Sequence, residues 1–137
     1  MRRNLLFASI AIIGCFTYVL LQGENTSHAQ QKDGLLLAHD VYFSLKDSSP
    51  EAKKKLVAAC KKYLSGHDGE VFFATGTRAE TFKRDVNDQD YDVALQIVFK
   101  DQASHDKYAV AKRHLQFIDE NKANWKKVRV FDSWVQR

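Results

Sequence analysis

Hydrophobic and polar positions alternate most clearly between Tyr91 and Phe99, where every second residue is apolar. This period of two is typical of a β-strand with one buried face. Three other short runs are rich in apolar and aromatic residues and are bounded by polar or turn-forming positions. They lie over Leu35–Leu45, Val71–Thr77 and Val128–Val135. The chain is therefore predicted to contain four strands.

Apolar residues recur at helical spacing in two other segments. Ser49 and the proline that follows it are typical of an N-cap and a first helical position, and Gly66 ends the apolar stripe. These signals predict a helix over Pro50–Leu64. A second helical region, capped by its first residue, is expected over Asp101–Asn121, before the last strand.

This order of elements, β-α-β-β-α-β, is that of a ferredoxin-like α+β domain with an antiparallel sheet. Two helical segments cover one face of the sheet and leave the other face uncovered. The uncovered face is expected to carry both polar and apolar residues: Asp40, Tyr42, Ser44, Asp92, Ala94, Gln96 and Val98. Such a face suits packing against a second sheet, and a domain of this size gains stability by burying more surface. We therefore expect a homodimer joined through the sheets, a dimeric α+β barrel.

Residues 1–29 differ in composition from everything after them. Two arginines precede an uncharged, mostly apolar run over Leu5–Leu21, and polar residues follow. Small side chains at Ser27 and Ala29 then mark a cleavage site before Gln30. This layout predicts a secretory signal peptide.

Retention of residues 5–21 as a membrane anchor is the main alternative to cleavage, because the run is near the lower length limit for crossing a bilayer. Attachment of a lipid at Cys15 and export through a twin-arginine signal are two further readings. Residues 30–34 are expected to form a linker, and residues 35–137 the domain. With or without cleavage, the domain is expected outside the cytoplasm, periplasmic or extracellular.

The composition suits one globular domain, with 137 residues of which 45% are hydrophobic and 28% charged. Without residues 1–29 the chain has 19 basic and 16 acidic residues, a net charge that gives no footprint of a nucleic-acid partner. No Ser-His-Asp order, Gly-rich phosphate loop or pair of catalytic carboxylates appears in the sequence, which argues against hydrolase and nucleotide chemistry. Cys60 is expected to be a core residue, and the charges of the loop 83–90 are expected to pair locally.

An ordered set of residues then narrows the fold class: His39–Lys46, Tyr91–Leu95, Phe99, Tyr108, His114 and Val130–Asp132. The set resembles the stress-responsive α/β-barrel (Dabb) family, from His39 to Trp134. The resemblance implies a ferredoxin-like chain that dimerises into an α+β barrel, in agreement with the uncovered sheet face. It does not imply a reaction, because one fold hosts many functions.

Polyketide cyclases of this family close a carbon chain by aldol chemistry without a metal. The resemblance places their acid–base histidine at His114, its tyrosine partner at Tyr108 and a further pocket histidine at His39. We expect a pocket between sheet and helices that binds a small apolar or aromatic molecule. Alternatives are a cofactor-independent lyase or cyclase with His114 as base, and a stress-linked dimer without a ligand. The aromatic residues expected around the pocket are Phe43, Phe72, Phe73, Phe99, Trp125, Phe131 and Trp134.

One departure from the family pattern lies between Tyr108 and His114. Family members often have His-Pro there, which breaks the helix, whereas this chain has Ala111 and Lys112, which both favour helix. Six residues of unbroken helix, at about 100° each, place the two side chains about 120° apart. Tyr108 and His114 are therefore not expected to converge on one substrate atom.

The remaining histidines give no reason to expect a metal or a cofactor. His39 alternates with apolar neighbours and should face the same interior as His114. His67 lies in a turn and His105 at a polar helix start, so both should be solvated. The spacing matches no zinc motif, and no cysteine or third histidine is placed to complete a site. We therefore expect no bound metal and no cofactor.

Overall fold

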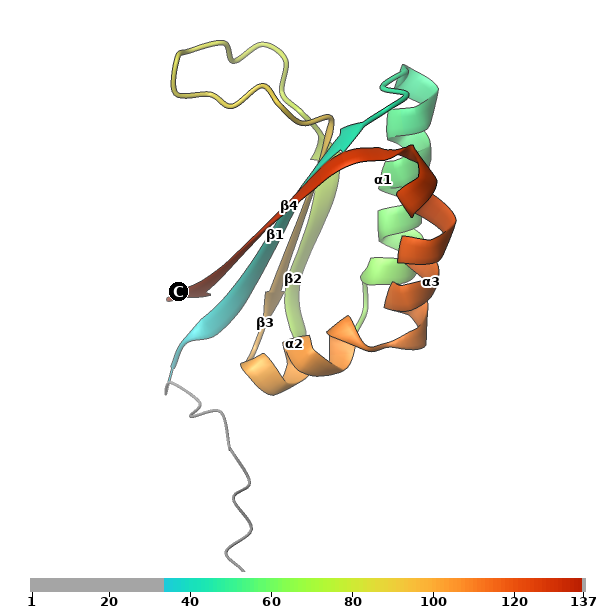
Figure 1. Ribbon diagram of the computed structural model, residues 1–137. Coiled ribbons are helices and arrows are strands. Elements are labelled where there is room, and N and C mark those ends of the chain that lie inside the picture. Colours follow the sequence, from blue (N-terminus) through green and yellow to red (C-terminus); the bar gives the residue numbers. More distant parts are fainter. Residues whose placement is uncertain (1–33, 137) are drawn as a thin grey trace, which may run out of the picture.

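The computed structural model describes residues 34–136 and arranges them as four strands and three α-helices (Figure 1). The predicted leader over residues 1–29 and most of the predicted linker lie outside the described residues. No helix in the described span has the length and apolar character needed to cross a bilayer. In chain order the elements are β1 (Leu36–Leu45), α1 (Pro50–Leu64), β2 (Glu70–Thr77), β3 (Val93–Phe99), α2 (Gln102–Ala109), α3 (Lys112–Asn121), a 3-10 turn (Lys122–Asn124) and β4 (Trp125–Val135).

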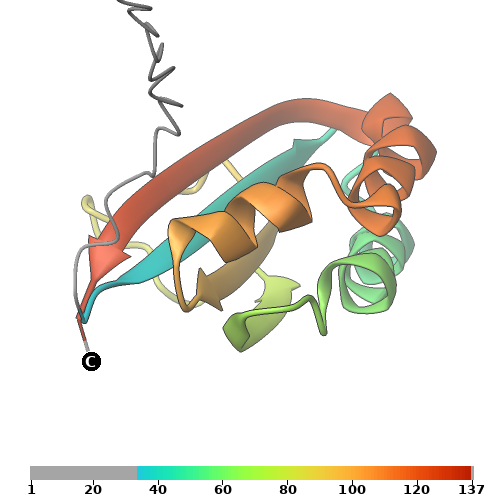
Figure 2. The ribbon, with the colours of Figure 1, turned by 90° about the horizontal axis from the view of Figure 1, so that it is seen from below.

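The four strands form one antiparallel sheet in the order β2-β3-β1-β4. All helices lie on one face of this sheet, and the opposite face is left open by the described residues (Figure 1). Viewed from below, α2 runs beneath the sheet while α1 and α3 stand together at one end of the view (Figure 2). The predicted ferredoxin-like α+β fold is confirmed.

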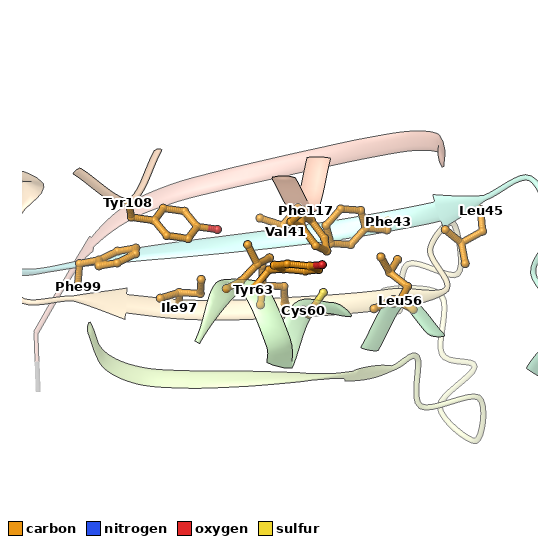
Figure 3. Close-up of a cluster of buried hydrophobic side chains, with 13 residues drawn as sticks. Val41, Phe43, Leu45, Leu56, Cys60, Tyr63, Ile97, Phe99, Tyr108 and Phe117 are labelled. Carbon is orange, nitrogen blue, oxygen red and sulfur yellow. The ribbon is translucent and has the colours of Figure 1, made fainter. Parts of the chain in front are cut away.

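The core forms where α1 meets the inward face of the two central strands. β3 alternates as predicted, with Leu95 and Ile97 almost fully buried and Gln96 between them exposed. From α1, the buried side chains are Leu56, Cys60, Tyr63 and Leu64 (Figure 3). Burial raises the pKa of the Cys60 thiol to about 12, so this thiol stays protonated and behaves as a small core residue.

The second helical region is not continuous, and its predicted extent is wrong. It stops at Ala109 and resumes at Lys112, with Ala111 in an extended conformation (φ −63°, ψ 137°). The Ala109 carbonyl, which has no helical partner after the break, accepts a hydrogen bond from His114 Nδ1 at 2.8 Å. Arg113 donates to the Tyr63 carbonyl at the end of α1. The tertiary bond from Arg113 and the local bond from His114 together outweigh the intrinsic helix preference of Ala111 and Lys112.

Two strand boundaries also differ from the prediction. β4 begins at Trp125 rather than Val128, and β3 begins at Val93 rather than Tyr91. Asp92 therefore does not belong to the open sheet face: its carboxylate accepts a hydrogen bond from the Leu45 backbone at 2.8 Å and lies 3.6 Å from Lys53 of α1. A carboxylate at this position ties the sheet to the helix layer.

The charged loop 78–92 is fastened to β4, so the prediction of purely local pairing is wrong. Asp90 pairs with Lys127 at 2.8 Å, and Asp88 pairs with Arg129. Each pair joins residues about forty positions apart in the chain. The loop projects from the end of the sheet on the side away from the helices (Figure 1).

Two glycines after α1 offer a matched test of how the turn and α2 are fitted together. Gly66 and Gly69 both have positive φ, +70° and +81°, but only at Gly69 would an added Cβ clash, 2.1 Å from the Ser104 hydroxyl of α2. Gly66→Ala should cost about 1–2 kcal/mol, the strain of a left-handed alanine. Gly69→Ala should cost clearly more, measured by urea denaturation. Equal losses would contradict this close approach.

Candidate functional site

A cavity of about 220 Å³ lies between the sheet and the helices α2 and α3. Its wall is almost entirely apolar, and its polar side chains include the three residues that the resemblance singled out, His39, Tyr108 and His114. The full lining is His39, Val41, Phe43, Leu64, Leu95, Tyr108, His114, Phe117, Ile118, Trp125, Val128 and Val130. Of the aromatic residues expected around the pocket, Phe43 and Trp125 line this cavity, whereas Phe72, Phe73, Phe99, Phe131 and Trp134 do not. Phe72 and Phe131 leave about half of their surface exposed.

Tyr108 and His114 do converge, so the expectation that they point apart is wrong. Their ring centroids are 4.5 Å apart. The break between α2 and α3 changes the direction of the chain between them, and the helical angle of about 120° no longer applies. The constellation implied by the family is therefore present without a proline.

His114 is held as a neutral base with one nitrogen available. A carbonyl oxygen can only accept, so the bond to the Ala109 carbonyl fixes the proton on Nδ1 and leaves a lone pair on Nε2. Burial lowers the pKa of His114, and the nearby histidines lower it further, although the bond to Ala109 acts in the opposite direction. The imidazole is therefore neutral at pH 7, the state in which it accepts a proton.

Tyr108 is 2% exposed, and its ring packs on Phe99 with 5.1 Å between centroids. Figure 3 shows these two rings at one end of the core, with Leu45 and Leu56 at the other. Burial raises the pKa of the Tyr108 phenol, which therefore remains protonated. Nothing in residues 34–136 hydrogen-bonds to its hydroxyl, although buried tyrosine hydroxyls usually have a partner.

His39 lies on β1 and is buried on the helix side of the sheet, as its alternation predicts. Its Nδ1 lies 2.7 Å from Oδ1 of Asp132, the residue directly opposite on β4. Because a carboxylate accepts, Nδ1 carries a proton, and in the neutral imidazole Nε2 keeps a lone pair. No role is predicted for Asp132 from the sequence, because its contact with His39 depends on the register between β1 and β4.

His67 and His105 are only partly exposed to solvent, which differs from the prediction that both are solvated. Both are partly buried, and their ring centroids lie 4.9 Å and 6.3 Å from that of Tyr108. All four histidines of the described residues therefore surround one phenol. No local pattern indicates this cluster, because its members come from β1, the turn after α1, α2 and α3.

The sequence matches the family model of the stress responsive A/B barrel domain over residues 37–135. The chain belongs to this family. The resemblance found in the sequence is thus confirmed, and the matched span contains every residue that lines the cavity. A comparison with curated proteins found no match.

Solved structures share the fold at low sequence identity. A Dabb-family protein with a ferredoxin-like fold from Mesorhizobium loti is 24% identical, with a TM-score of 0.61, and the match covers 72% of this chain and 95% of that one. A hydroxynitrile lyase from Passiflora edulis is 15% identical, with a TM-score of 0.61 and coverage of 76% and 96%. A dimeric ferredoxin-like protein from Thermobifida fusca is 13% identical, with a TM-score of 0.63 and coverage of 75% and 93%.

At these identities the likeness shows the fold alone. The matched part nevertheless makes up nearly all of each solved chain. Residues 30–137 contain the whole span that matches the family model and are therefore the protein used in the solution experiments proposed below.

The lowered pKa of His114 gives stability a dependence on pH whose sign can be stated. Between the folded pKa and the ordinary value of 6.5, the unfolded chain binds more protons than the folded chain. Above pH 6.5, the ordinary pKa, His114 is neutral in both states and the full free energy of unfolding is present. As the pH falls from there through the folded pKa, proton binding favours the unfolded chain and stability is lost. Urea denaturation at about pH 7.5 and about pH 5.5 should show this loss.

The matched variant is His114→Asn, whose amide can still donate to the Ala109 carbonyl but does not titrate. The histidines facing His114 from β1, the turn and α2 remain in both proteins, so the difference between the two proteins reports the titration of His114 together with its coupling to them. The natural protein should lose more stability on acidification than the variant. An equal loss in both would refute a lowered pKa at this position.

Proposed function

We propose that the cavity binds a small, largely apolar or aromatic molecule that carries a hydroxyl or carbonyl oxygen. The observation that carries this proposal is a set of three polar atoms which, besides the buried and unpartnered indole nitrogen of Trp125, lie on the wall of a largely apolar cavity. These atoms are Nε2 of His39, Nε2 of His114 and the hydroxyl of Tyr108, and no described residue hydrogen-bonds to them. Water can reach these three atoms in the free protein, and a polar ligand group can take the place of that water.

The donor and acceptor pattern of these atoms limits the ligand. Both imidazole nitrogens accept, and the Tyr108 hydroxyl can donate. A ligand hydroxyl complements both roles, since it donates to one imidazole and accepts from the phenol. The volume of about 220 Å³ limits the size, because a dry cavity of about 150 Å³ holds benzene. One aromatic ring with a small substituent is the appropriate scale.

A cofactor-independent lyase or cyclase is the second candidate, favoured by the state of His114. Its lowered pKa and fixed tautomer suit a general base that removes a proton from a ligand hydroxyl or an activated carbon. Tyr108 would then stabilise the developing oxyanion by donating its proton in a hydrogen bond. The hydroxynitrile lyase among the similar structures gives one probe: release of benzaldehyde from mandelonitrile that His114→Asn loses would favour catalysis over binding alone.

We further propose a homodimer joined through the open sheet face. Several similar structures are described as dimeric. Phe72 and Phe131 are about half exposed, and Tyr42 packs edge-on against Phe131 at 5.8 Å, so the open face carries an aromatic patch. A second copy covers such a patch without any change of the core. A stress-linked dimer without a ligand, the third hypothesis for function, requires only this interface.

Export stays a proposal that rests on the sequence. The charged start, apolar run and small residues before Gln30 support cleavage, and retention of residues 5–21 is its alternative. In either case the cavity works outside the cytoplasm. Intact-mass measurement on protein from the native host distinguishes cleavage from retention, because cleavage gives the mass of a chain that begins at Gln30.

Phenol is a suitable first probe of the cavity. Titration calorimetry should show saturable binding, and Tyr108→Phe, which keeps the shape of the ring, should weaken it by about 0.5–1.5 kcal/mol, the worth of one hydrogen bond. Val130→Phe should lower the affinity for phenol at least about tenfold, because Val130 lines the cavity and a larger side chain there fills it. Val130 is half exposed, so the fold should tolerate the larger side chain.

Val110→Phe is the matched control, since Val110 is 73% exposed and does not line the cavity. It should bind phenol as the natural protein does. Absence of saturable binding to the natural protein, or unchanged binding to Val130→Phe, would rule out the cavity as the ligand site.

The dimer gives a separate prediction. Light scattering on residues 30–137 should give twice the mass of one chain, and Phe131→Glu should shift it toward the monomer by placing a charge in the apolar interface. Leu115→Glu, an exposed position of α3 on the helix layer, should remain dimeric. A monomeric natural protein at micromolar concentration would refute the barrel.

A further inference from the structure

Three neighbouring side chains, of which only His39 lines the cavity, have the composition of a transition-metal site. One ring nitrogen from His39, one from His105 and a carboxylate oxygen of Asp132 all lie within 4.8 Å of one another. They come from β1, α2 and β4 respectively. The reason for expecting no metal was the lack of a placed third ligand, and the fold supplies that ligand.

The surroundings of the three side chains support coordination. Nδ1 of His105 lies 3.3 Å from the carboxylate of Asp106, which leaves Nε2 as its ligating atom. Histidines that bind metals commonly donate their other nitrogen to a carboxylate in this way. His39 is buried, and the side chain of Asp132 is 48% exposed. The group therefore extends from the interior to the surface, where an ion can reach it from solvent.

We propose that His39, His105 and Asp132 bind a divalent transition cation such as Zn²⁺. The ion replaces the proton shared by His39 Nδ1 and Asp132 Oδ1, which are 2.7 Å apart. Ligand atoms about 2.0 Å from a tetrahedral ion are about 3.3 Å apart, so this pair opens slightly and the partly exposed His105 rotates inward. Three ligands leave a fourth position for water or a ligand atom.

The chemistry of the group selects the class of cation. Two imidazoles and one carboxylate suit Zn²⁺, Co²⁺ or Ni²⁺, whereas Mg²⁺ and Ca²⁺ prefer oxygen ligands. With neutral imidazoles, the carboxylate offsets one of the two charges of the ion. The ion would also join β4 and α2, and it should therefore raise the thermal stability of the domain.

The test uses residues 30–137 without a histidine tag, treated with a chelator and then dialysed. Calorimetry with ZnCl₂ should give one site per chain, and the melting temperature should rise with Zn²⁺ but not with Mg²⁺. Addition of Co²⁺ should give the visible absorption of a four-coordinate ion. His105→Gln and, independently, Asp132→Asn should each weaken Zn²⁺ binding more than about tenfold.

His67→Gln is the matched control, because His67 also contacts the Tyr108 ring but does not belong to the group. It should bind Zn²⁺ as the natural protein does. The proposal is overturned if Zn²⁺ produces no saturable binding, if both ligand variants bind as the natural protein does, or if His67→Gln loses the site equally.

The metal group shares only His39 with the cavity of the proposed organic ligand, and variants at the unshared residues let the two proposals fail separately. His105 and Asp132 do not line the cavity, so His105→Gln should retain phenol binding. Val130→Phe should lose phenol and retain Zn²⁺. Loss of one kind of binding in the natural protein therefore leaves the other proposal standing.

Discussion

The hydrogen bond from His114 Nδ1 to the Ala109 carbonyl joins the path of the backbone to the chemistry of the cavity. It satisfies a carbonyl that the break between α2 and α3 would otherwise leave without a partner. The same bond fixes the imidazole tautomer and turns the lone pair of Nε2 away from the helix end. Because the break redirects the chain, Tyr108 of α2 and His114 of α3 meet across 4.5 Å. In a continuous helix, the Ala109 carbonyl would bond within the helix instead of to His114, and the side chains of Tyr108 and His114 would point apart.

The sheet and α1 could be predicted because their signals are local. Alternation along β3 and the cap at Ser49 each depend on neighbouring residues only, and the structure has both. The break after Ala109 could not, since it depends on Arg113 reaching the end of α1, fifty residues earlier. The histidine cluster was missed for the same reason. Helix preference is worth a few tenths of a kcal/mol per residue, less than the tertiary bonds that oppose it here.

β4 is one of the two edge strands of the sheet. Among the described residues β1 is its one strand partner, and its inward residues Val128 and Val130 stay partly exposed where the helices do not cover them. The cavity therefore opens along this strand. On the other face, Phe131 belongs to the aromatic patch of the open sheet. β4 thus borders both the proposed ligand site and the surface proposed to meet a second chain, so ligand binding and dimerisation would be coupled through this strand.

The cavity is polar at one end and apolar at the other, and this asymmetry should orient whatever enters it. His39 pairs with Asp132 near one end of β4, whereas Trp125 begins the strand beside the rings of Phe43 and Phe117. An apolar ring placed in the polar half would leave three hydrogen-bonding atoms unsatisfied, whereas the reverse orientation pairs them and buries the ring among aromatic side chains. Protonation of one imidazole also disfavours protonation of the others. Asp132 carries the charge that offsets a cation at the polar end, so that end can hold a proton or a metal ion without burying an unpaired charge.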